Sequence, residues 1–413
     1  MRILHTSDWH LGQHFMGQSR QAEHRALIAW LVAQVDAQGV DAVLIAGDIF
    51  DTGAPPSYAR ELYNQLIARL HQAGVALLVL GGNHDSVSVL DESRDLLRHL
   101  GTQVIAATGA PPQHAITLPL RRSGDPGCIV CALPFIRARD VQQSLAGQSA
   151  LDKQLALQAA IQSTYQQVYE AALTQQAALL HSLGRKLPII ATGHLTTVGA
   201  SSSESVREIY VGSLEAFPTN AFPPADYIAL GHIHQPQKVG GLEHIRYSGS
   251  PIALGFDEAR QTKQVLLVDV GEAGLQAVTP LPIPAFQALA TIRCNLAALP
   301  GALQDIASRA DAQRATWVDI TIEEDDYLAD LPARVEALAD GLPVRVLRIK
   351  RQRGTAAAQL QSAAMESLGD LTAQEVFARR LAQETLDPPL QQALTERYQE
   401  IVRTVTATEG DAA

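Results

Sequence analysis

The chain has 413 residues, of which 46% are hydrophobic and 18% are charged, and its formal net charge is −11. This length and composition predict two or three folded domains and exclude a largely disordered chain. Its three cysteines exclude a disulfide scaffold and favour a reducing compartment, and its acidic balance means that nucleic acid would be bound through a local patch or bound cations.

A signal peptide and a membrane span are not expected from the sequence. The opening MRILHTSDWH lacks the apolar stretch of a signal peptide, and no apolar run reaches the length of about 18 residues that a membrane span needs. We therefore expect a cytoplasmic protein without a membrane segment.

Short runs rich in Ile, Val and Leu recur along the first 270 residues, where helical patterns separate them. Five of these runs read as buried strands, at residues 2–4, 42–46, 75–80, 187–191 and 227–230. Two more strands are expected at 128–133 and 264–270, and helices at 21–38, 57–72 and 154–183. Strand alternating with helix predicts a layered α/β domain.

A second unit follows the proline-rich stretch at 279–284. Strands are expected at 290–294, 316–322 and 344–350, with a helix at 331–339. A segment rich in Ala, Gln and Ser then reads as a linker. We therefore expect a first domain at 1–280, a small α+β domain at 281–353, a linker at 354–370 and a helical tail at 371–413.

The tail contains two expected helices, separated by Pro388-Pro389. In the second helix one apolar stripe is formed by Leu390, Leu394, Tyr398 and Ile401. Such a stripe either packs within the chain or docks on another chain, and its place after a linker favours docking.

Polar side chains follow each of the five strands at the point where the strand ends. The segments are Asp8-Trp9-His10, Gly47-Asp48, Gly82-Asn83, Gly193-His194 and Gly231-His232-Ile233-His234. In open α/β sheets ligands bind beyond the carboxyl ends of the strands. The candidate ligands are Asp8, His10, Asp48, Asn83, His194, His232 and His234.

Carboxylate, imidazole and amide oxygen together suit Mn, Fe or Zn. None of the candidate ligands is a cysteine, which argues against a structural zinc site. One ion does not need this many ligands, but two ions sharing one carboxylate do, and Asp48 is the best candidate for the bridge. Two ions about 3.5–4 Å apart polarise a phosphoryl oxygen and activate water. A lone Gly-Asp or Gly-His usually marks only a loop, but five such sites at five strand ends favour a metal centre.

Five motifs in this order, DWH, GDIFDTG, GNHD, GH and GHIH, resemble those of the calcineurin-like metallophosphoesterases. The segments RILHTSDWHLG, GDIFDTGAPPSYAR and LTAQEVFARRL are more closely similar to the SbcD family, the nuclease subunits of bacterial SbcC–SbcD complexes. The resemblance covers nearly the whole chain. It implies a layered α/β metallophosphoesterase fold of two central β-sheets flanked by helices, with a small α+β capping domain and a C-terminal helical tail.

The resemblance also implies a role for each candidate in the site. One manganese ion would be bound by Asp8, His10, Asp48 and His234, and the other by Asp48, Asn83, His194 and His232. Magnesium is the possible substitute. His84 would be a general acid for the leaving 3′ oxygen or would stabilise the scissile phosphate, because an imidazole titrates near neutrality. Asp51 would orient His84, or would only close a turn.

Contacts to DNA are expected from two regions. His14 and Arg20 follow the first motif and would line the DNA side. In the small domain Arg348, Lys350 and Arg351 belong to a basic run at 345–353, whose alternative role is a solvated strand face.

The family implies a partner as well, an SbcC-like ATPase with a coiled coil, bound by the tail. The tail residues expected to bind it are Phe377, Leu381, Leu390, Leu394 and Tyr398. Two copies of the chain would form a homodimer within a heterotetramer, associated with the nucleoid.

The resemblance implies a Mn-dependent DNA nuclease, a 3′→5′ exonuclease on double strands and an endonuclease on single strands and hairpins, acting in DNA repair, replication and recombination. One alternative is a stand-alone phosphomonoesterase or cyclic-nucleotide phosphodiesterase of the same fold, which would not require the small domain and tail. The other is a scaffold protein with a degenerate metal site, against which the full set of ligands and His84 argue.

Overall fold

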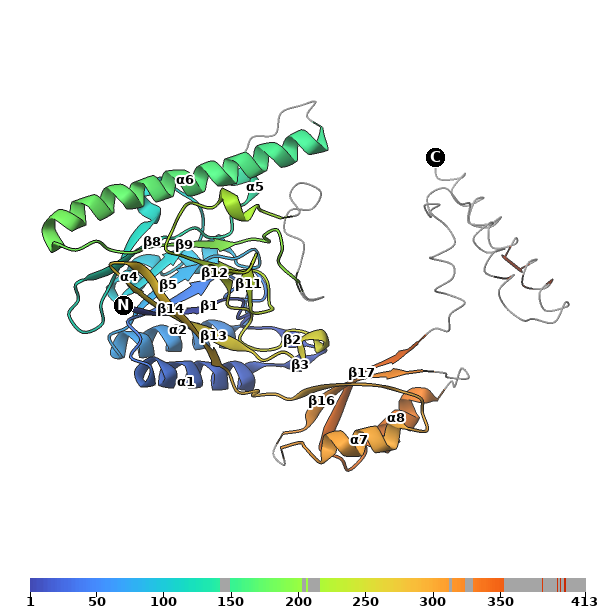
Figure 1. Cartoon of the computed structure of the whole chain (residues 1–413). Helices are drawn as coiled ribbons and strands as arrows, with labels where there is room; N and C mark the ends of the chain where they lie inside the picture. The colour runs from blue at the N-terminus through green and yellow to red at the C-terminus, as the bar shows by residue number, and fades with distance from the viewer. Residues whose placement is uncertain are drawn as a thin grey trace. The chain divides into compact units, whose positions relative to one another are not determined.

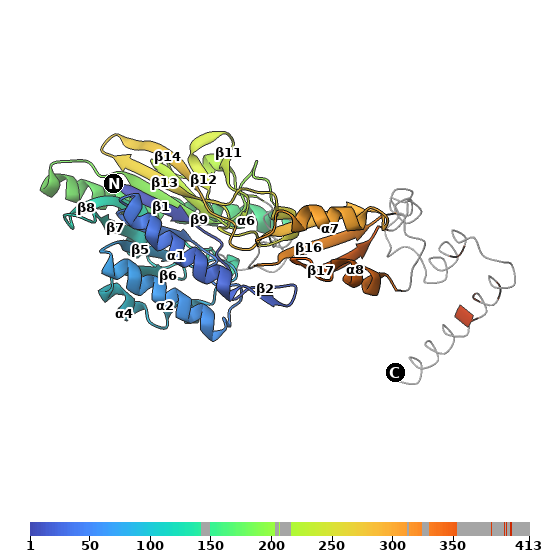
Figure 2. The same cartoon turned by 90° about the horizontal axis from the view of Figure 1, so that it is seen from below.

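A computed structural model provides the structure of the chain (Figures 1 and 2). It describes residues 1–141, 149–202, 206, 216–311, 314–323 and 330–352, with single positions 381, 392, 394, 397 and 398 of the tail. Within this described part, no helix combines the length and the apolar character that crossing a membrane would require.

Two six-stranded sheets form the centre of the larger unit. The first has the order β14 (Gly274–Pro282), β13 (Gln264–Gly271), β1 (Arg2–Thr6), β4 (Ala42–Ala46), β5 (Ala76–Leu80) and β6 (Thr102–Ile105). The second has the order β11 (Gln237–Val239), β12 (Leu242–Tyr247), β10 (Tyr227–Gly231), β9 (Ile189–His194), β8 (Pro126–Cys131) and β7 (Ala115–Pro119).

In each sheet the strands that lead to candidate ligands run parallel. β1, β4, β5 and β6 are parallel neighbours, and so are β8, β9, β10 and β12. The antiparallel strands lie outside them, with β13 pairing with β1 and β7 with β8. The carboxyl ends of the parallel strands in a sheet therefore share one edge, as the sequence predicts.

Helices cover the outer face of each sheet (Figures 1 and 2). On the first sheet, Leu31 of α1 (Gln21–Ala37) and Leu66 of α2 (Ser57–Gln72) share a core with Val43. On the second sheet, Ile161 of α6 (Ala150–Leu183) packs in a core with Ala191. This helix, green in Figure 1, lies on the side of the sheets opposite α1 and α2.

A third core lies between the two sheets and joins Leu44 and Leu80 of the first to Val130 and Ile190 of the second. The layers are therefore helix, sheet, sheet and helix. The predicted layered fold of two central sheets flanked by helices is confirmed.

α6 begins four residues before the sequence pattern indicated, at Ala150. The earlier start follows from a capping box, in which the Ser149 side chain accepts from the Asp152 backbone N–H and the Asp152 carboxylate accepts from the Ser149 N–H. Gly184, with φ 68°, ends the helix in a left-handed conformation that glycine adopts readily.

Shorter elements complete the larger unit. They are β2 (His14–Phe15), β3 (Gln18–Ser19), α3 (Val87–Asp91), α4 (Arg94–His99) and α5 (Ala138–Val141). The proline-rich stretch belongs largely to β14, an edge strand, where proline is tolerated because its missing N–H faces no partner strand.

The later part of the chain forms a three-stranded sheet of order β15 (Leu289–Cys294), β16 (Thr316–Ile322) and β17 (Val344–Arg351), with α7 (Leu299–Ala307) and α8 (Leu331–Ala339). Sequence analysis missed α7, because Pro300 and Gly301 near its start read as a loop.

Contacts divide the chain into a unit of Met1–Thr291, Leu303–Asp319 and Gly341–Arg348 and a unit of Ile292–Ala302, Ile320–Asp340 and Ile349–Ala413. The exact domain boundaries at 280 and 353 stay a prediction.

Candidate metal centre

The candidate ligands from five strand ends meet at one place. Asp8, His10 and His234 bring ligand atoms within 4.8 Å of one another, and so do Asp48, His194 and His232. Asn83 joins the second group, since its Oδ1 lies 2.8 Å from Nε2 of His194. β1, β4 and β5 of the first sheet and β9 and β10 of the second lead to these residues.

The backbone at this site is strained. Among the described residues five that are not glycine have positive φ, and four of them are candidate ligands: Asp8 (56°), His10 (47°), Asp48 (50°) and His232 (95°). Such conformations are uncommon for non-glycine residues and persist where the surrounding structure fixes them. The fold therefore holds these four side chains in directions that relaxed strand ends would not give.

Two glycines give the ligands room. A Cβ on Gly47 would lie 2.2 Å from Nδ1 of His194, and one on Gly82 would lie 2.1 Å from Oδ1 of Asp48. Neither side chain can move away without leaving the cluster. Glycine at these strand ends is thus required by the close approach of the ligands.

Three of the candidate ligand histidines are anchored through Nδ1. His10 Nδ1 lies 3.1 Å from Oδ1 of Asp51, His194 Nδ1 lies 2.9 Å from the Ala46 carbonyl, and His234 Nδ1 lies 3.2 Å from Oε1 of Glu258. Histidines that bind metals ordinarily donate one ring N–H to a carbonyl or carboxylate in this way. Anchoring at Nδ1 assigns the ligand role to Nε2 in each ring.

Buried nitrogen atoms test whether a cation fits here. Nε2 of His10 and Nε2 of His232 are buried and have no hydrogen-bond partner among the described residues. The His10 atom lies 3.7 Å from Oδ2 of Asp48. Unpaired buried polar atoms are rare in folded proteins, and imidazole nitrogens beside carboxylates match the ligand preferences of divalent transition metals. The residues present therefore fit divalent cations.

Close charges set the protonation of the Asp48 and His194 side chains. Burial alone would raise the pKa of the Asp48 carboxyl, but the imidazoles of His194, His10 and His84 hold it well below its usual range. Burial opposes protonation of His194, yet the Asp48 carboxylate 3.2 Å away raises the pKa of that ring to about 9. Asp48 lies close to His10 as well as to His194 and His232, and its lowered pKa favours the ionised carboxylate that a bridging ligand would require.

His84 lies at the edge of the cluster, half-buried, with its ring 4.7 Å from that of His10. Its Nδ1 donates to the backbone carbonyl of Asp51 over 2.7 Å, and its backbone N–H donates to Oδ1 of Asp48 over 2.9 Å. Asp51 thus meets His84 through its main chain, while its carboxylate faces His10.

Asp85 is a residue of the site that sequence analysis did not select. Its buried carboxylate accepts N–H groups from Ile49 and Phe50, on the loop after β4, and from Gly82, on the loop after β5. Burial and the charge of Asp48 raise the pKa of Asp85 to about 6, against the effect of these donors. Asp85 thereby joins the loop of Asp48 to the loop of Asn83.

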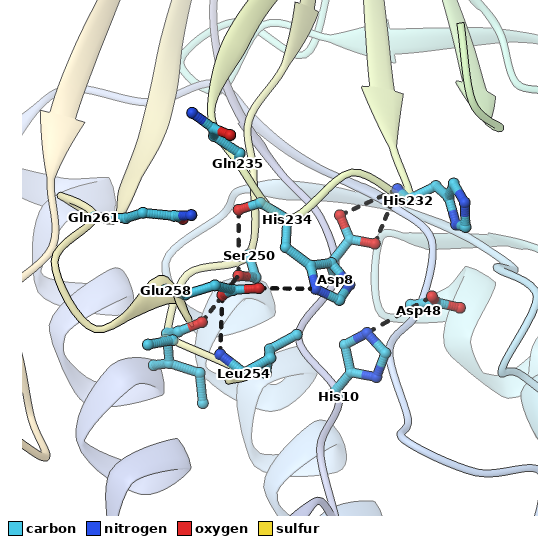
Figure 3. A network of polar contacts seen from close by, with 12 residues as sticks. Asp8, His10, Asp48, His232, His234, Gln235, Ser250, Leu254, Glu258 and Gln261 are labelled. Atoms are coloured by element: carbon cyan, nitrogen blue, oxygen red, sulfur yellow. Dashed lines mark hydrogen bonds and ion pairs between the residues drawn. The ribbon is translucent and has the colours of Figure 1, made fainter. Parts of the chain in front are cut away.

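Glu258, Lys263 and Ser250 were also missed. All three side chains are buried and contact His234. Figure 3 shows Glu258 and Ser250 beside His234. No motif in the sequence marks them, because FDEARQTK reads as an ordinary charged loop. The signal for Asp85 was present, since it directly follows Asn83-His84.

Arg20 is enclosed by the protein, so the prediction that it contacts DNA is not supported by its geometry. Its side chain is 0% exposed, donates to Glu23 over 2.7 Å and to the Ala253 carbonyl over 2.6 Å, and lies over the ring of Phe15. An arginine so enclosed has no donor to offer a phosphate. His14, in contrast, is exposed on β2.

The basic residues of β17 also differ in their exposure and in their partners. Two nitrogens of the Arg348 guanidinium donate to the Asp319 carboxylate, at 2.8 and 2.7 Å, so the prediction that Arg348 contacts DNA is not supported by its geometry. Lys350 is exposed and Arg351 half-buried. Phe377 and Leu390 of the tail lie outside the described residues. Leu381, Leu394 and Tyr398 are described as helical positions, and Leu394 is 39% exposed.

His5, Cys128 and Cys131 are buried residues with structural roles. His5 Nδ1 lies 3.0 Å from the Tyr227 hydroxyl, and burial lowers the pKa of His5 to about 3. Cys128 and Cys131 are buried in different cores on opposite faces of β8, and burial raises the pKa of each thiol to about 12. Both cysteines therefore pack in the core.

Comparison with known proteins agrees with the geometry. Residues 1–236 match the model of the calcineurin-like phosphoesterase family, and residues 285–385 match SbcD_C, described as Type 5 capsule protein repressor C-terminal domain. A structural match to a beta-glucosidase from Exiguobacterium marinum, 11% identical over 80% of this chain and 78% of that one with a TM-score of 0.20, carries no weight. The fold and the site thus define a calcineurin-like phosphoesterase that uses divalent metal.

Full-length relatives narrow the class further. The chain is 48% identical to the SbcD subunit of the SbcCD nuclease of Escherichia coli (strain K12), over 98% of each chain. It is 34% identical to the protein of the same name from Rhodobacter capsulatus, over 84% of this chain and 86% of the relative, and 32% identical to that from Bacillus subtilis (strain 168), over 65% and 66%. The chain belongs to the SbcD family.

Proposed function

We infer that the chain is the nuclease subunit of an SbcC–SbcD-type complex and hydrolyses phosphodiester bonds in DNA. The observation that carries this inference is the convergence of Asp8, Asp48, Asn83 and four histidines beside His84. The chain is also 48% identical, over nearly its full length, to a protein named as such a subunit.

Two Mn²⁺ ions are the proposed cofactors, with Mg²⁺ as the alternative. The first would be held by Asp8, His10, Asp48 and His234, and the second by Asp48, Asn83, His194 and His232. Mixed imidazole and carboxylate ligands favour Mn²⁺ over Mg²⁺, which prefers oxygen. When bound, such ions stabilise phosphoryl charge and lower the pKa of water.

His84 is proposed to hold the proton that the leaving 3′ oxygen takes up. A carbonyl oxygen only accepts hydrogen bonds, so the Asp51 carbonyl fixes Nδ1 of His84 as a donor. The exchangeable proton is then carried by Nε2, on the other side of the ring. Asp51 would orient two residues of the site: its carbonyl would orient His84, and its carboxylate would orient His10.

DNA and an SbcC-like ATPase with a coiled coil are the proposed partners. The acidic chain, at −11, cannot attract a duplex by its net charge. Local contacts from His14, Lys350 and Arg351 and charge from the ATPase would therefore be needed. The tail at 371–413 would bind the ATPase, and two copies of the chain would pair within a heterotetramer.

Nucleotide release from linear duplex DNA tests the proposal. We expect Mn²⁺-dependent 3′→5′ digestion of duplexes and cutting of hairpins and single strands, under the control of partner and ATP. Turnover of a small phosphomonoester such as p-nitrophenyl phosphate without action on DNA would favour a phosphomonoesterase. Inertness toward both substrates would favour a scaffold protein.

A further inference from the structure

A buried ion pair lies directly behind the proposed ligand His234. Glu258 is 0% exposed and Lys263 is 7% exposed, and Nζ of Lys263 lies 2.7 Å from Oε2 of Glu258. The residues lie near one another in sequence, around the short helix Phe256–Glu258 and the start of β13. Two charges removed from water in this way require close pairing and further hydrogen bonds.

Glu258 uses its two carboxylate oxygens differently, one toward His234 and the other toward Leu254 (Figure 3). Oε1 of Glu258 faces Nδ1 of His234 at 3.2 Å. Oε2 accepts from Lys263 and from the backbone N–H of Leu254 over 3.0 Å. Lys263 also donates to the backbone carbonyl of His234 over 3.1 Å and to Oγ of Ser250 over 2.9 Å.

These contacts hold both ends of His234. Lys263 fixes the main chain at the carbonyl, and Glu258 fixes the ring at Nδ1. A well-packed apolar pair would fill the same space without the desolvation of two charges, so stability alone does not account for an ion pair here. A carboxylate that accepts from Nδ1 also makes the ring a stronger ligand through Nε2.

We propose that Glu258, with Lys263 as its counter-ion, is a positioning residue that orients and polarises His234 as a ligand of one of the two metal sites. The inference rests on the proposed two-ion centre. It also predicts an asymmetry, because His194 of the other site is anchored by the Ala46 carbonyl, which does not depend on Glu258.

Binding of Mn²⁺ to the full-length chain tests the proposal without reference to activity. In a titration, the electron paramagnetic resonance signal of free Mn²⁺ gives the number of ions bound and the dissociation constant of each binding step. We expect two ions in the wild type and, in Glu258→Gln, one step weakened by about 10- to 100-fold with the other unchanged. Glu243→Gln is the matched control, since Glu243 also pairs with a lysine but is 63% exposed.

A second variant separates positioning from folding. Glu258→Gln leaves Lys263 buried without its counter-ion and destabilises the fold, whereas the double variant Glu258→Gln/Lys263→Met removes both charges. If Glu258 positions His234, the double variant regains thermal stability while the same Mn²⁺ step stays weak.

Each remaining outcome is decisive. Recovery of both Mn²⁺ steps together with stability would assign Glu258 a structural role only and overturn the proposal. Two unchanged steps in Glu258→Gln would overturn it as well. Failure of the wild type itself to bind two ions would instead overturn the two-ion centre on which the proposal rests.

Discussion

Replacing Asp85 by asparagine isolates the link between the two loops that carry Asp48 and Asn83. The substitution keeps the size of the side chain and replaces one carboxylate oxygen by an NH₂ group. Oδ2 of Asp85 accepts from Ile49 at 3.1 Å and Gly82 at 2.8 Å, while Oδ1 accepts from Phe50 at 2.9 Å. The amide oxygen is expected to take the position with two donors, leaving the Phe50 N–H opposite an NH₂ group.

The expected loss follows from that count. One buried N–H without an acceptor destabilises a protein by about 1–3 kcal/mol. The two hydrogen bonds that remain also lose the assistance of a charged acceptor, so this range is a lower bound. In an equilibrium between closed and open loops, about 1–3 kcal/mol corresponds to a factor of roughly 5 to 150.

Amide hydrogen exchange of the metal-free full chain measures this opening directly. Exchange at Ile49, Phe50 and Gly82 is expected to accelerate by that factor in Asp85→Asn, and thermal unfolding to shift downward. Asp95→Asn on exposed α4 serves as the control, because the Asp95 side chain is 91% exposed. Unchanged exchange at all three amides in Asp85→Asn would refute the assignment of Asp85 as the link.

Three further predictions concern His84, the metal ions and Arg20. His84→Ala should lower the rate of DNA hydrolysis by about 10²- to 10⁴-fold yet bind two Mn²⁺ ions, and a full rate would exclude His84 as the acid. Chelation should abolish hydrolysis and Mn²⁺ restore it, with the free energy of unfolding raised by about 2.7 kcal/mol for each ion bound at 100 times its dissociation constant; no Mn²⁺-dependent rise would contradict a site in the native state. Arg20→Met should destabilise the chain by about 3–5 kcal/mol, since Glu23 loses its buried partner, while the salt dependence of DNA binding stays unchanged. A lowered salt slope would restore Arg20 as a phosphate contact.

The layered fold and the cluster of candidate ligands were predictable because short continuous segments of the sequence indicate both. Apolar runs such as 42–46 mark buried strands, and each ligand directly follows its strand. Parallel strands bring these ends to one edge, so a list of strand ends becomes a site. The strained φ angles of Asp8 and Asp48 were not predictable, because neither residue type demands them.

Contacts between distant segments account for what sequence analysis missed. Glu258 reaches His234 across 24 positions, and nothing in its neighbourhood distinguishes it from a solvated glutamate. Arg20 was expected on the DNA side because it follows the first motif, yet Glu23 and the Ala253 carbonyl enclose it. The role of an isolated residue is therefore harder to predict than that of a residue that directly follows a predicted strand.

Anomalous diffraction from a crystal grown with Mn²⁺ tests the central claim most directly. We expect two peaks, one beside Asp8, His10 and His234 and the other beside Asn83, His194 and His232, with the Asp48 carboxylate touching both. A single peak, or peaks away from Asp48, would contradict a two-ion centre formed by these strand ends.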